Sequence, residues 1–168
     1  MNQKIIIILI IMVIAIAGTF YFLQQPKPVQ NNTQGTINNQ PTNNKTLNLS
    51  NQGLTSVPSY VFNQTNLEEL NISNNSITGA IQSQINQLTN LKVLNASNNL
   101  MTGVPAEVGQ LQKLEILDLS NNKLTGLPNE LGNLKNLKTL NLSGNQYSKQ
   151  DLDYIKSKLS PTTNIIVK

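Results

Sequence analysis

The sequence predicts an α/β fold: a short right-handed solenoid with a parallel sheet on its concave face and a C-terminal cap made of a helix and a strand. One leucine pattern, L-x-x-L-x-L-x-x-N-x-L, recurs along the chain. Its L-x-L core alternates with the period of a strand, and the pattern stops where a helical pattern begins. The second leucine recurs at intervals of 23, 24, 23 and 23 residues, at Leu47, Leu70, Leu94, Leu117 and Leu140.

Residues 1–23 are predicted to be a transmembrane anchor or a signal segment. An uncharged apolar run from Ile5 to Leu23 would extend about 28 Å as a helix, close to the thickness of the hydrocarbon core of a bilayer. Lys4 precedes this run, so the positive-inside rule predicts a single-pass cell-membrane protein with its C-terminal part outside the cytoplasm. The alternative is secretion after cleavage, because Ala15-Ile-Ala17 has the small-x-small form that a signal peptidase accepts.

Residues 24–44 are predicted to be a disordered tether. Three prolines occur there among many Asn, Gln and Thr residues, and Val29 and Ile37 are the only large apolar side chains. Such a composition cannot bury a core. A flexible coil of this length has an average end-to-end distance of about 25 Å. The folded part would therefore sample a broad zone above the membrane.

Residues 45–147 contain five repeats. The central unit, Leu114-Glu-Ile-Leu117-Asp-Leu119-Ser-Asn-Asn122-Lys-Leu124, shows the whole pattern. The following halves M-T-G-V-P-A-E-V-G-Q-L and L-T-G-L-P-N-E-L-G-N-L, from Met101 and Leu124, are near copies of each other. This spaced motif resembles the leucine-rich repeat family. The segment I-T-G-A-I-Q from Ile77 is similar to the L-T-G-x-I-P form of plant receptor-type repeats, with Gln82 in place of the proline.

The repeat pattern also predicts the strand of each unit and the connection that leads to the next strand. The two leucines of each L-x-L core would point inward, while the residues that follow them, Asp118 and Ser120 in the central unit, would point outward. The connection to the next strand is too short for a regular helix with two loops. Pro105 and Pro128 therefore favour extended or one-turn segments on the convex side.

Four asparagines occupy one position of the pattern, where the chain turns away from the strand. This turn leaves backbone groups inside the solenoid that need hydrogen-bond partners. An inward-pointing amide both donates and accepts, so we expect a structural ladder that runs from repeat to repeat. Its members are Asn75, Asn99, Asn122 and Asn145.

Residues 148–168 are predicted to cap the open end of the core. Ser148-Lys-Gln-Asp151 reads as a variant of the capping box that opens a helix, and Pro161 would end this helix. The helix would place Leu152, Ile155 and Leu159 on one face. Asn164-Ile-Ile-Val167 would then form a short strand that pairs with the edge of the last repeat.

The composition argues against an enzyme. The sequence has no His and no Cys, so the commonest general base, the thiol nucleophile and two common metal ligands are missing. It has no glycine-rich phosphate loop, and its eight carboxylates are scattered. We therefore expect no catalytic residue, no cofactor and no metal site. The net charge of +4 comes from dispersed lysines without interleaved aromatics, so nucleic acid is not an expected partner.

Stacking the units would align their outward strand residues in columns. Two columns are almost uniform, as copying of a repeat alone would produce. The asparagine column is Asn48, Asn71, Asn95, Asp118 and Asn141, and the serine column is Ser50, Ser73, Ser97, Ser120 and Ser143. Another column varies, from Thr46 through Glu69, Val93 and Ile116 to Thr139, and Asp118 interrupts the asparagines. Variation within a copied array marks specificity. The expected partner contacts are therefore Glu69, Val93, Asn95, Ile116, Asp118, Thr139 and Asn141.

These observations lead to the hypothesis of a non-enzymatic recognition module, tethered to the membrane, that binds a protein or glycan partner through the concave sheet. The alternative is a structural or adhesive surface spacer without a defined ligand.

Overall fold

The structure, a computed structural model, describes residues 44–168. The predicted anchor or signal segment, and the predicted tether up to residue 43, lie outside these residues. Within the described part, no helix has both the length and the apolar character needed to cross a membrane.

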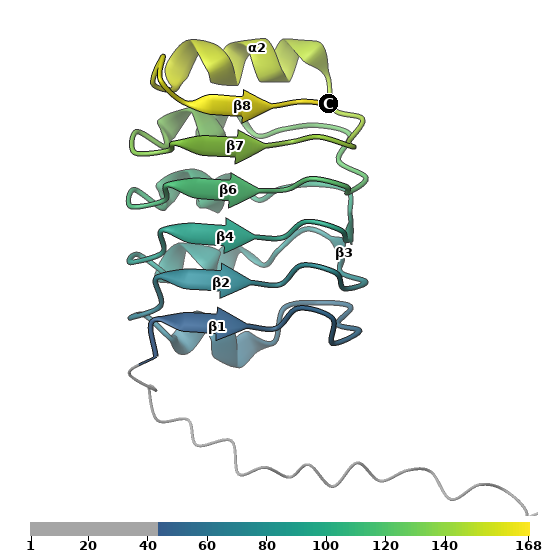
Figure 1. Cartoon of the computed structure of the whole chain (residues 1–168), viewed down its shortest axis with the longest axis vertical. Helices are drawn as coiled ribbons and strands as arrows, with labels where there is room; N and C mark the ends of the chain where they lie inside the picture. Colours follow the sequence, from purple (N-terminus) through teal and green to yellow (C-terminus); the bar gives the residue numbers. More distant parts are fainter. Residues whose placement is uncertain (1–43) are drawn as a thin grey trace, which may run out of the picture. The chain divides into compact units, whose positions relative to one another are not determined.

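A six-stranded parallel sheet forms one face of the solenoid, with its strands side by side in Figure 1. The strand order is β1-β2-β4-β6-β7-β8, so each repeat adds one strand next to the previous one. The bounds are Thr46–Asn48 for β1, Glu69–Asn71 for β2, Val93–Asn95 for β4, Ile116–Asp118 for β6, Thr139–Asn141 for β7 and Asn164–Ile166 for β8. The register places the second leucine of each unit opposite the same leucine of the next.

Four 3-10 helices return the chain behind the sheet. They are η1 (Ser59–Asn63), η2 (Ser83–Gln87), η3 (Ala106–Gln110) and η4 (Asn129–Asn133). An extended residue precedes each helix, and in three cases it is a proline, which fixes the backbone angle required there. The predicted one-turn connections are thus confirmed. Gln82 takes this place before η2 with a φ of −65°, and its side-chain amide donates to the carbonyl of Val57 at 2.9 Å.

A short second sheet lies beside the point where the 24-residue unit carries its extra residue. It consists of β3 (Thr78–Gly79) and β5 (Leu100–Met101), which pair in parallel.

One continuous core fills the space between the sheet and the 3-10 helices. In the second, third and fourth units, every apolar position of the repeat pattern is at most 1% exposed. The packing also brings backbone close to backbone, because a Cβ added at Gly109 in η3 would lie 2.6 Å from the carbonyl carbon of Glu130 in η4. Only glycine fits at that approach. In the first unit, Leu47 and Leu54 are half-buried.

The four asparagines of the repeat pattern bond to backbone groups across neighbouring units. The Nδ2 atom of Asn122 donates to the carbonyls of Ala96 and Leu119 at 3.0 Å each, and its Oδ1 atom accepts from the N–H of Met101 at 3.1 Å. Asn75, Asn99 and Asn145 make the equivalent bonds. Just before Asn75, Asn99 and Asn122, another asparagine has a left-handed backbone: Asn74, Asn98 and Asn121. Asn51 in the first unit has the same conformation before Gln52, and Gly144 takes this place before Asn145.

The C-terminal end carries α2 (Lys149–Lys158), the only α-helix among residues 44–168, together with β8. Leu152, Ile155 and Leu159 are buried against the last repeat, as expected. Ser148 caps the helix by accepting the N–H of Asp151 at 3.2 Å. The Asp151 carboxylate accepts the N–H of Leu127 at 3.2 Å, in the preceding repeat. The capping contact therefore also ties the helix to the solenoid.

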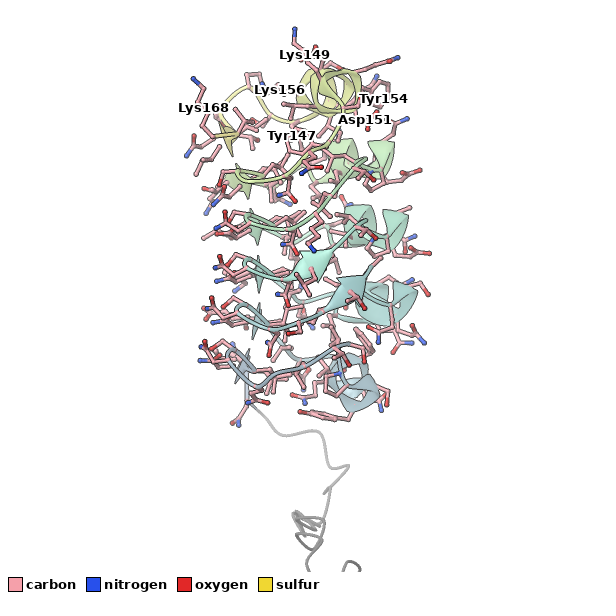
Figure 2. The ribbon with its side chains drawn as sticks, turned by 90° about the vertical axis from the view of Figure 1, so that its right-hand side faces the viewer. Tyr147, Lys149, Asp151, Tyr154, Lys156 and Lys168 are labelled. Carbon is pink, nitrogen blue, oxygen red and sulfur yellow. The ribbon has the colours of Figure 1, made fainter. Side chains whose placement is uncertain are left out.

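Figure 2 shows the polar side chains around this end. Asp151 lies toward the repeats, in agreement with its bond to Leu127, whereas Lys149 projects outward from the helix. Strand β8 pairs in parallel with β7, so the predicted cap strand is confirmed. The helix covers the 3-10 side of the core and the strand completes the sheet side.

Candidate interaction surface

The outward side chains of the sheet form one surface, here called the sheet face. It consists of the first and third residues of the five repeat strands. These are Thr46, Asn48, Glu69, Asn71, Val93, Asn95, Ile116, Asp118, Thr139 and Asn141. The middle residue of each strand points into the core. Every sequence-predicted contact residue belongs to the sheet face, and together they lie on four consecutive strands.

The asparagine column is held by local hydrogen bonds. In each unit, the side-chain Oδ1 of the third strand residue accepts the backbone N–H of the serine two positions later, at 2.9–3.2 Å. This side-chain-to-backbone bond shapes the turn that follows the strand. The column thus has a structural role in every unit.

Three serines of the serine column are buried, so the outward position expected for Ser120 does not give its hydroxyl access to solvent. Ser73, Ser97 and Ser120 are only 4–6% exposed. The hydroxyl of Ser120 donates to Oδ1 of Asp118 at 2.6 Å, and the hydroxyl of Ser97 donates to Oδ1 of Asn95 at 2.8 Å. The assigned strands end before the serines, but backbone bonds between units continue, because the N–H of Leu119 donates to the carbonyl of Asn141 and that of Asn121 to the carbonyl of Ser143.

The variable column places two apolar side chains next to each other. Val93 on β4 and Ile116 on β6 are register partners, and Ile116 is 41% exposed. Glu69 on β2 is the register partner of Val93 on the other side, and Thr139 on β7 continues the row after Ile116. The sheet face therefore has an apolar pair at its centre with an exposed carboxylate beside it.

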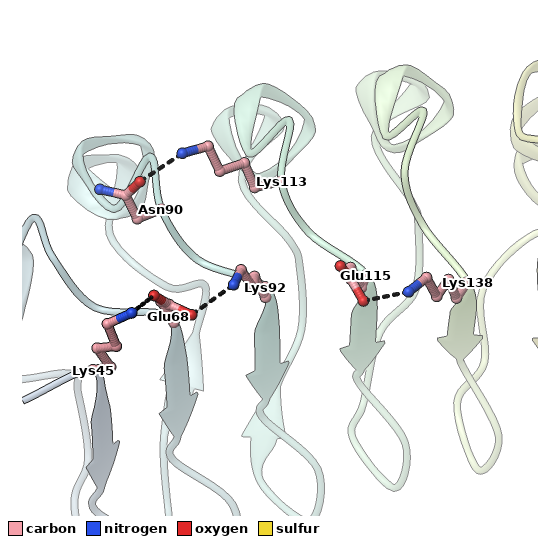
Figure 3. A network of polar contacts seen from close by, with 7 residues as sticks. All are labelled: Lys45, Glu68, Asn90, Lys92, Lys113, Glu115 and Lys138. Atoms are coloured by element: carbon pink, nitrogen blue, oxygen red, sulfur yellow. Dashed lines mark hydrogen bonds and ion pairs between the residues drawn. The ribbon is translucent and has the colours of Figure 1, made fainter.

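A row of charged side chains borders this column, one residue before each strand. Its signs alternate in the order Lys45, Glu68, Lys92, Glu115 and Lys138. Glu68 bridges two lysines, 2.6 Å from the Nζ atoms of Lys45 and Lys92, as Figure 3 shows. Glu115 binds Lys138 at 2.6 Å. The lysines of this row are thus engaged by glutamates of the same row.

The double bridge changes the acidity of Glu68. The hydrogen-bonded ammonium of Lys45, followed by that of Lys92, lowers the pKa of Glu68 from 4.5 to about 2. The same contact raises the pKa of Lys92. Both shifts come from mutual stabilisation of the charged forms.

Asp118 differs from its neighbours in the asparagine column by its charge. Its Oδ1 atom makes the same bonds to Ser120 that asparagine makes in other units, and its Oδ2 atom accepts from the side-chain amide of Asn141 at 3.2 Å. These donors are neutral. The carboxylate lies two residues beyond Ile116 on the same strand.

Sequence reasoning missed two contributors to this surface. Lys45 and Glu68 belong to the charged row, and their position one residue before the variable column was the available signal. Strand β8 also extends the sheet, because Ile166 is the register partner of Asn141 and is 37% exposed. From the sequence, the cap is predicted only to cover the open end of the core. Among residues 44–168, no three His, Cys, Asp or Glu side chains are grouped as metal ligands would be.

Comparisons with known proteins place the chain among repeat proteins. A family model described as a leucine-rich repeat region matches residues 43–155. No curated protein matches the sequence. A solved leucine-rich repeat protein of Leptospira interrogans is 41% identical with a TM-score of 0.62, over 66% of this chain and 28% of that one.

Two receptor ectodomains from Arabidopsis thaliana are also similar. That of the receptor kinase SOBIR1 is 30% identical with a TM-score of 0.58, over 72% of this chain and 67% of that one. That of the membrane receptor kinase GASSHO1/SCHENGEN3, solved in complex with CASPARIAN STRIP INTEGRITY FACTOR 2, is 30% identical with a TM-score of 0.56, over 67% of this chain and 14% of that one. The chain thus spans well under two thirds of the Leptospira and GASSHO1 structures. The family model covers more than half of the chain, so this chain belongs to the leucine-rich repeat family.

Proposed function

We propose that this chain is a non-enzymatic recognition module that binds a protein partner through the sheet face. The observation that carries the proposal is the apolar pair on the sheet face, the half-buried Val93 and the exposed Ile116. Each is at a position where other units have Thr or Glu, and neither is needed to fill the core. Apolar side chains held at the centre of a rigid sheet are the type of anchor around which protein interfaces form.

A protein partner is favoured over the glycan that the sequence also allowed. None of the ten sheet-face residues is aromatic, so the face lacks the rings on which sugar rings stack. The GASSHO1/SCHENGEN3 ectodomain, a member of the same family, is solved in complex with another protein factor, which supports binding of a polypeptide as a use of this fold.

The location of the module follows from residues 1–23. Their apolar run supports a single-pass anchor in the cell membrane, with the repeats outside the cytoplasm. Protease treatment of intact cells tests this: repeats outside the cytoplasm are digested, whereas repeats inside are protected until the membrane is opened. Sequencing the N-terminus of the mature chain separates a retained anchor from a cleaved signal.

A structural spacer is the second candidate function. It is favoured by the asparagine column, because local bonds to the serines account for that column without any ligand. A spacer predicts that no position of the sheet face has a recurrent partner.

Site-specific crosslinking in intact cells distinguishes the two functions. A photoreactive residue at Thr139, beside Ile116 on the sheet face, should capture one recurrent protein. The same residue at Asn129, on the opposite face, should not. The adduct should disappear when Ile116→Ser and Asp118→Asn are introduced together. Equal capture from both faces, or an adduct that survives these two changes, would contradict recognition by the sheet face.

A further inference from the structure

The sheet face carries two carboxylates that the molecule does not neutralise. Among residues 44–168, no ion pair involves Glu69 or Asp118, although Glu68 and Glu115, beside the same strands, are both paired with lysine. Lys92 lies within electrostatic reach of Glu69, but its ammonium is 2.6 Å from Glu68. The neighbouring cations are therefore already engaged, and the negative charges of the sheet face are available to a partner.

These two charges flank the apolar pair on opposite sides. Glu69 lies one strand before Val93 in the same column, and Asp118 lies two residues beyond Ile116 on the same strand. Strands are about 4.8 Å apart and rise about 3.3 Å per residue, which separates the Cα atoms of Glu69 and Asp118 by roughly 12 Å. An extended peptide covers this distance in about four residues.

The charge of Asp118 is not needed by the fold. Asn95 and Asn141, at the same position of adjacent units, accept the same bond from the serine two residues later. Relative to asparagine, the aspartate adds a negative charge and a second acceptor, Oδ2, which binds the neutral side-chain amide of Asn141. The full sequence has the opposite tendency, because it carries twelve lysines against eight acidic residues.

We propose that the partner of the sheet face presents an extended segment in which apolar residues are flanked by Lys or Arg. The apolar residues would pack on Val93 and Ile116, and the cations would bind Glu69 and Asp118. This inference rests on the proposed function, because it describes what the sheet face recognises. Electrostatic complementarity of this kind mainly selects the partner and speeds its encounter.

Selection from a random peptide library tests the proposal with the purified 168-residue chain as bait. We expect the selected peptides to be enriched in Lys or Arg next to aliphatic residues. Their affinity should fall about tenfold when Glu69→Gln and Asp118→Asn are combined, since two charged contacts are lost. Binding should also weaken as salt is raised, because exposed charge pairs are screened.

A matched control separates local contacts from net charge. The pair Glu107→Gln and Glu130→Gln removes the same charge from η3 and η4, behind the sheet, and should leave the affinity unchanged. A complementary gain is expected from Asn95→Asp, which should strengthen binding of the selected basic peptides.

Two negative outcomes have different meanings. Peptides that lose binding with Ile116→Ser, but show no basic enrichment and no response to the paired Glu69 and Asp118 changes, would overturn this inference and leave the proposed function standing. Peptides unaffected by Ile116→Ser as well, or a library that yields no binder, would count against both.

Discussion

Replacing Asn122 by leucine tests the asparagine ladder at one of its two buried members, Asn99 and Asn122. Asn122 is 7% exposed and bonds to three backbone carbonyls and one N–H. The carbonyls of Ala96 and Leu119 each keep a second asparagine donor after the substitution. The N–H of Met101 keeps no side-chain acceptor. The change therefore leaves one orphaned buried donor and removes three carbonyl contacts, to Ala96, Leu119 and Ser120.

The cost follows from these groups. A buried donor without a partner costs about 1–3 kcal/mol, and each lost carbonyl contact costs about 0.5–1.5 kcal/mol. Burial of the larger apolar surface offsets roughly 1 kcal/mol of this sum. We expect Asn122→Leu to lower the free energy of unfolding by about 3 kcal/mol. With a urea dependence of about 2 kcal/mol per molar, the midpoint should fall by about 1.5 M.

Asn145→Leu is the informative comparison, because Asn145 makes the same set of bonds but is half-buried. Water can reach the groups that it leaves, so the loss should be clearly smaller. Asn129→Leu, at an exposed position of η4, should change stability by less than about 0.5 kcal/mol. Urea unfolding followed by circular dichroism gives all three values. A midpoint for Asn122→Leu equal to that of Asn129→Leu, or above that of Asn145→Leu, would refute the reasoning.

Four further substitutions have clear expectations in the same unfolding assay. Glu68→Gln should lower the free energy of unfolding above pH ~5, and this difference from wild type should vanish as pH falls toward ~2. The reason is that a group with a lowered pKa stabilises the fold only while its carboxylate is charged. A pH-independent difference would contradict this. Gly109→Ala should cost at least about 2 kcal/mol through its overlap with backbone, whereas Gly103→Ala, with open space around it, should be nearly neutral. Gln82→Pro should raise the free energy of unfolding by about 0.5 kcal/mol, because the φ of Gln82 already suits proline and its buried Oε1 atom lacks a partner. A lower free energy of unfolding would show that the bond to Val57 matters more.

The repeat architecture was predictable because the sequence pattern of each unit independently indicates the same structure. Five copies of one pattern define which leucines point inward, and the shortness of the connection excludes regular helices. The cap was predictable from local signals, since Ser148 and the spacing from Leu152 to Leu159 need no knowledge of the rest of the fold. The destination of the Asp151 carboxylate was not predictable, because its acceptor role toward Leu127 depends on how α2 docks.

The sheet face was predictable only where the strand geometry persists. Glu69, Val93 and Ile116 lie inside strands, so their alternation held. Ser120 lies beyond the strand and is buried, with its hydroxyl bonded to the carboxylate of Asp118. The lysine and glutamate pairs needed the register between units, because each ion pair joins residues 23 or 24 positions apart.

The residues that depart from the repeat pattern therefore fall into two groups: those that the structure of the fold explains and those that it does not. Gly109 is required, because backbone occupies the space where a side chain would be. The structure also explains Gln82, because its side-chain amide bonds to the preceding unit. Ile116 and Asp118 have no such account. Ile116 is 41% exposed, and asparagine makes the Oδ1 bond of Asp118 to the following serine in the adjacent units. Two departures that the fold does not require, two residues apart on one strand, are best explained by a partner outside the molecule.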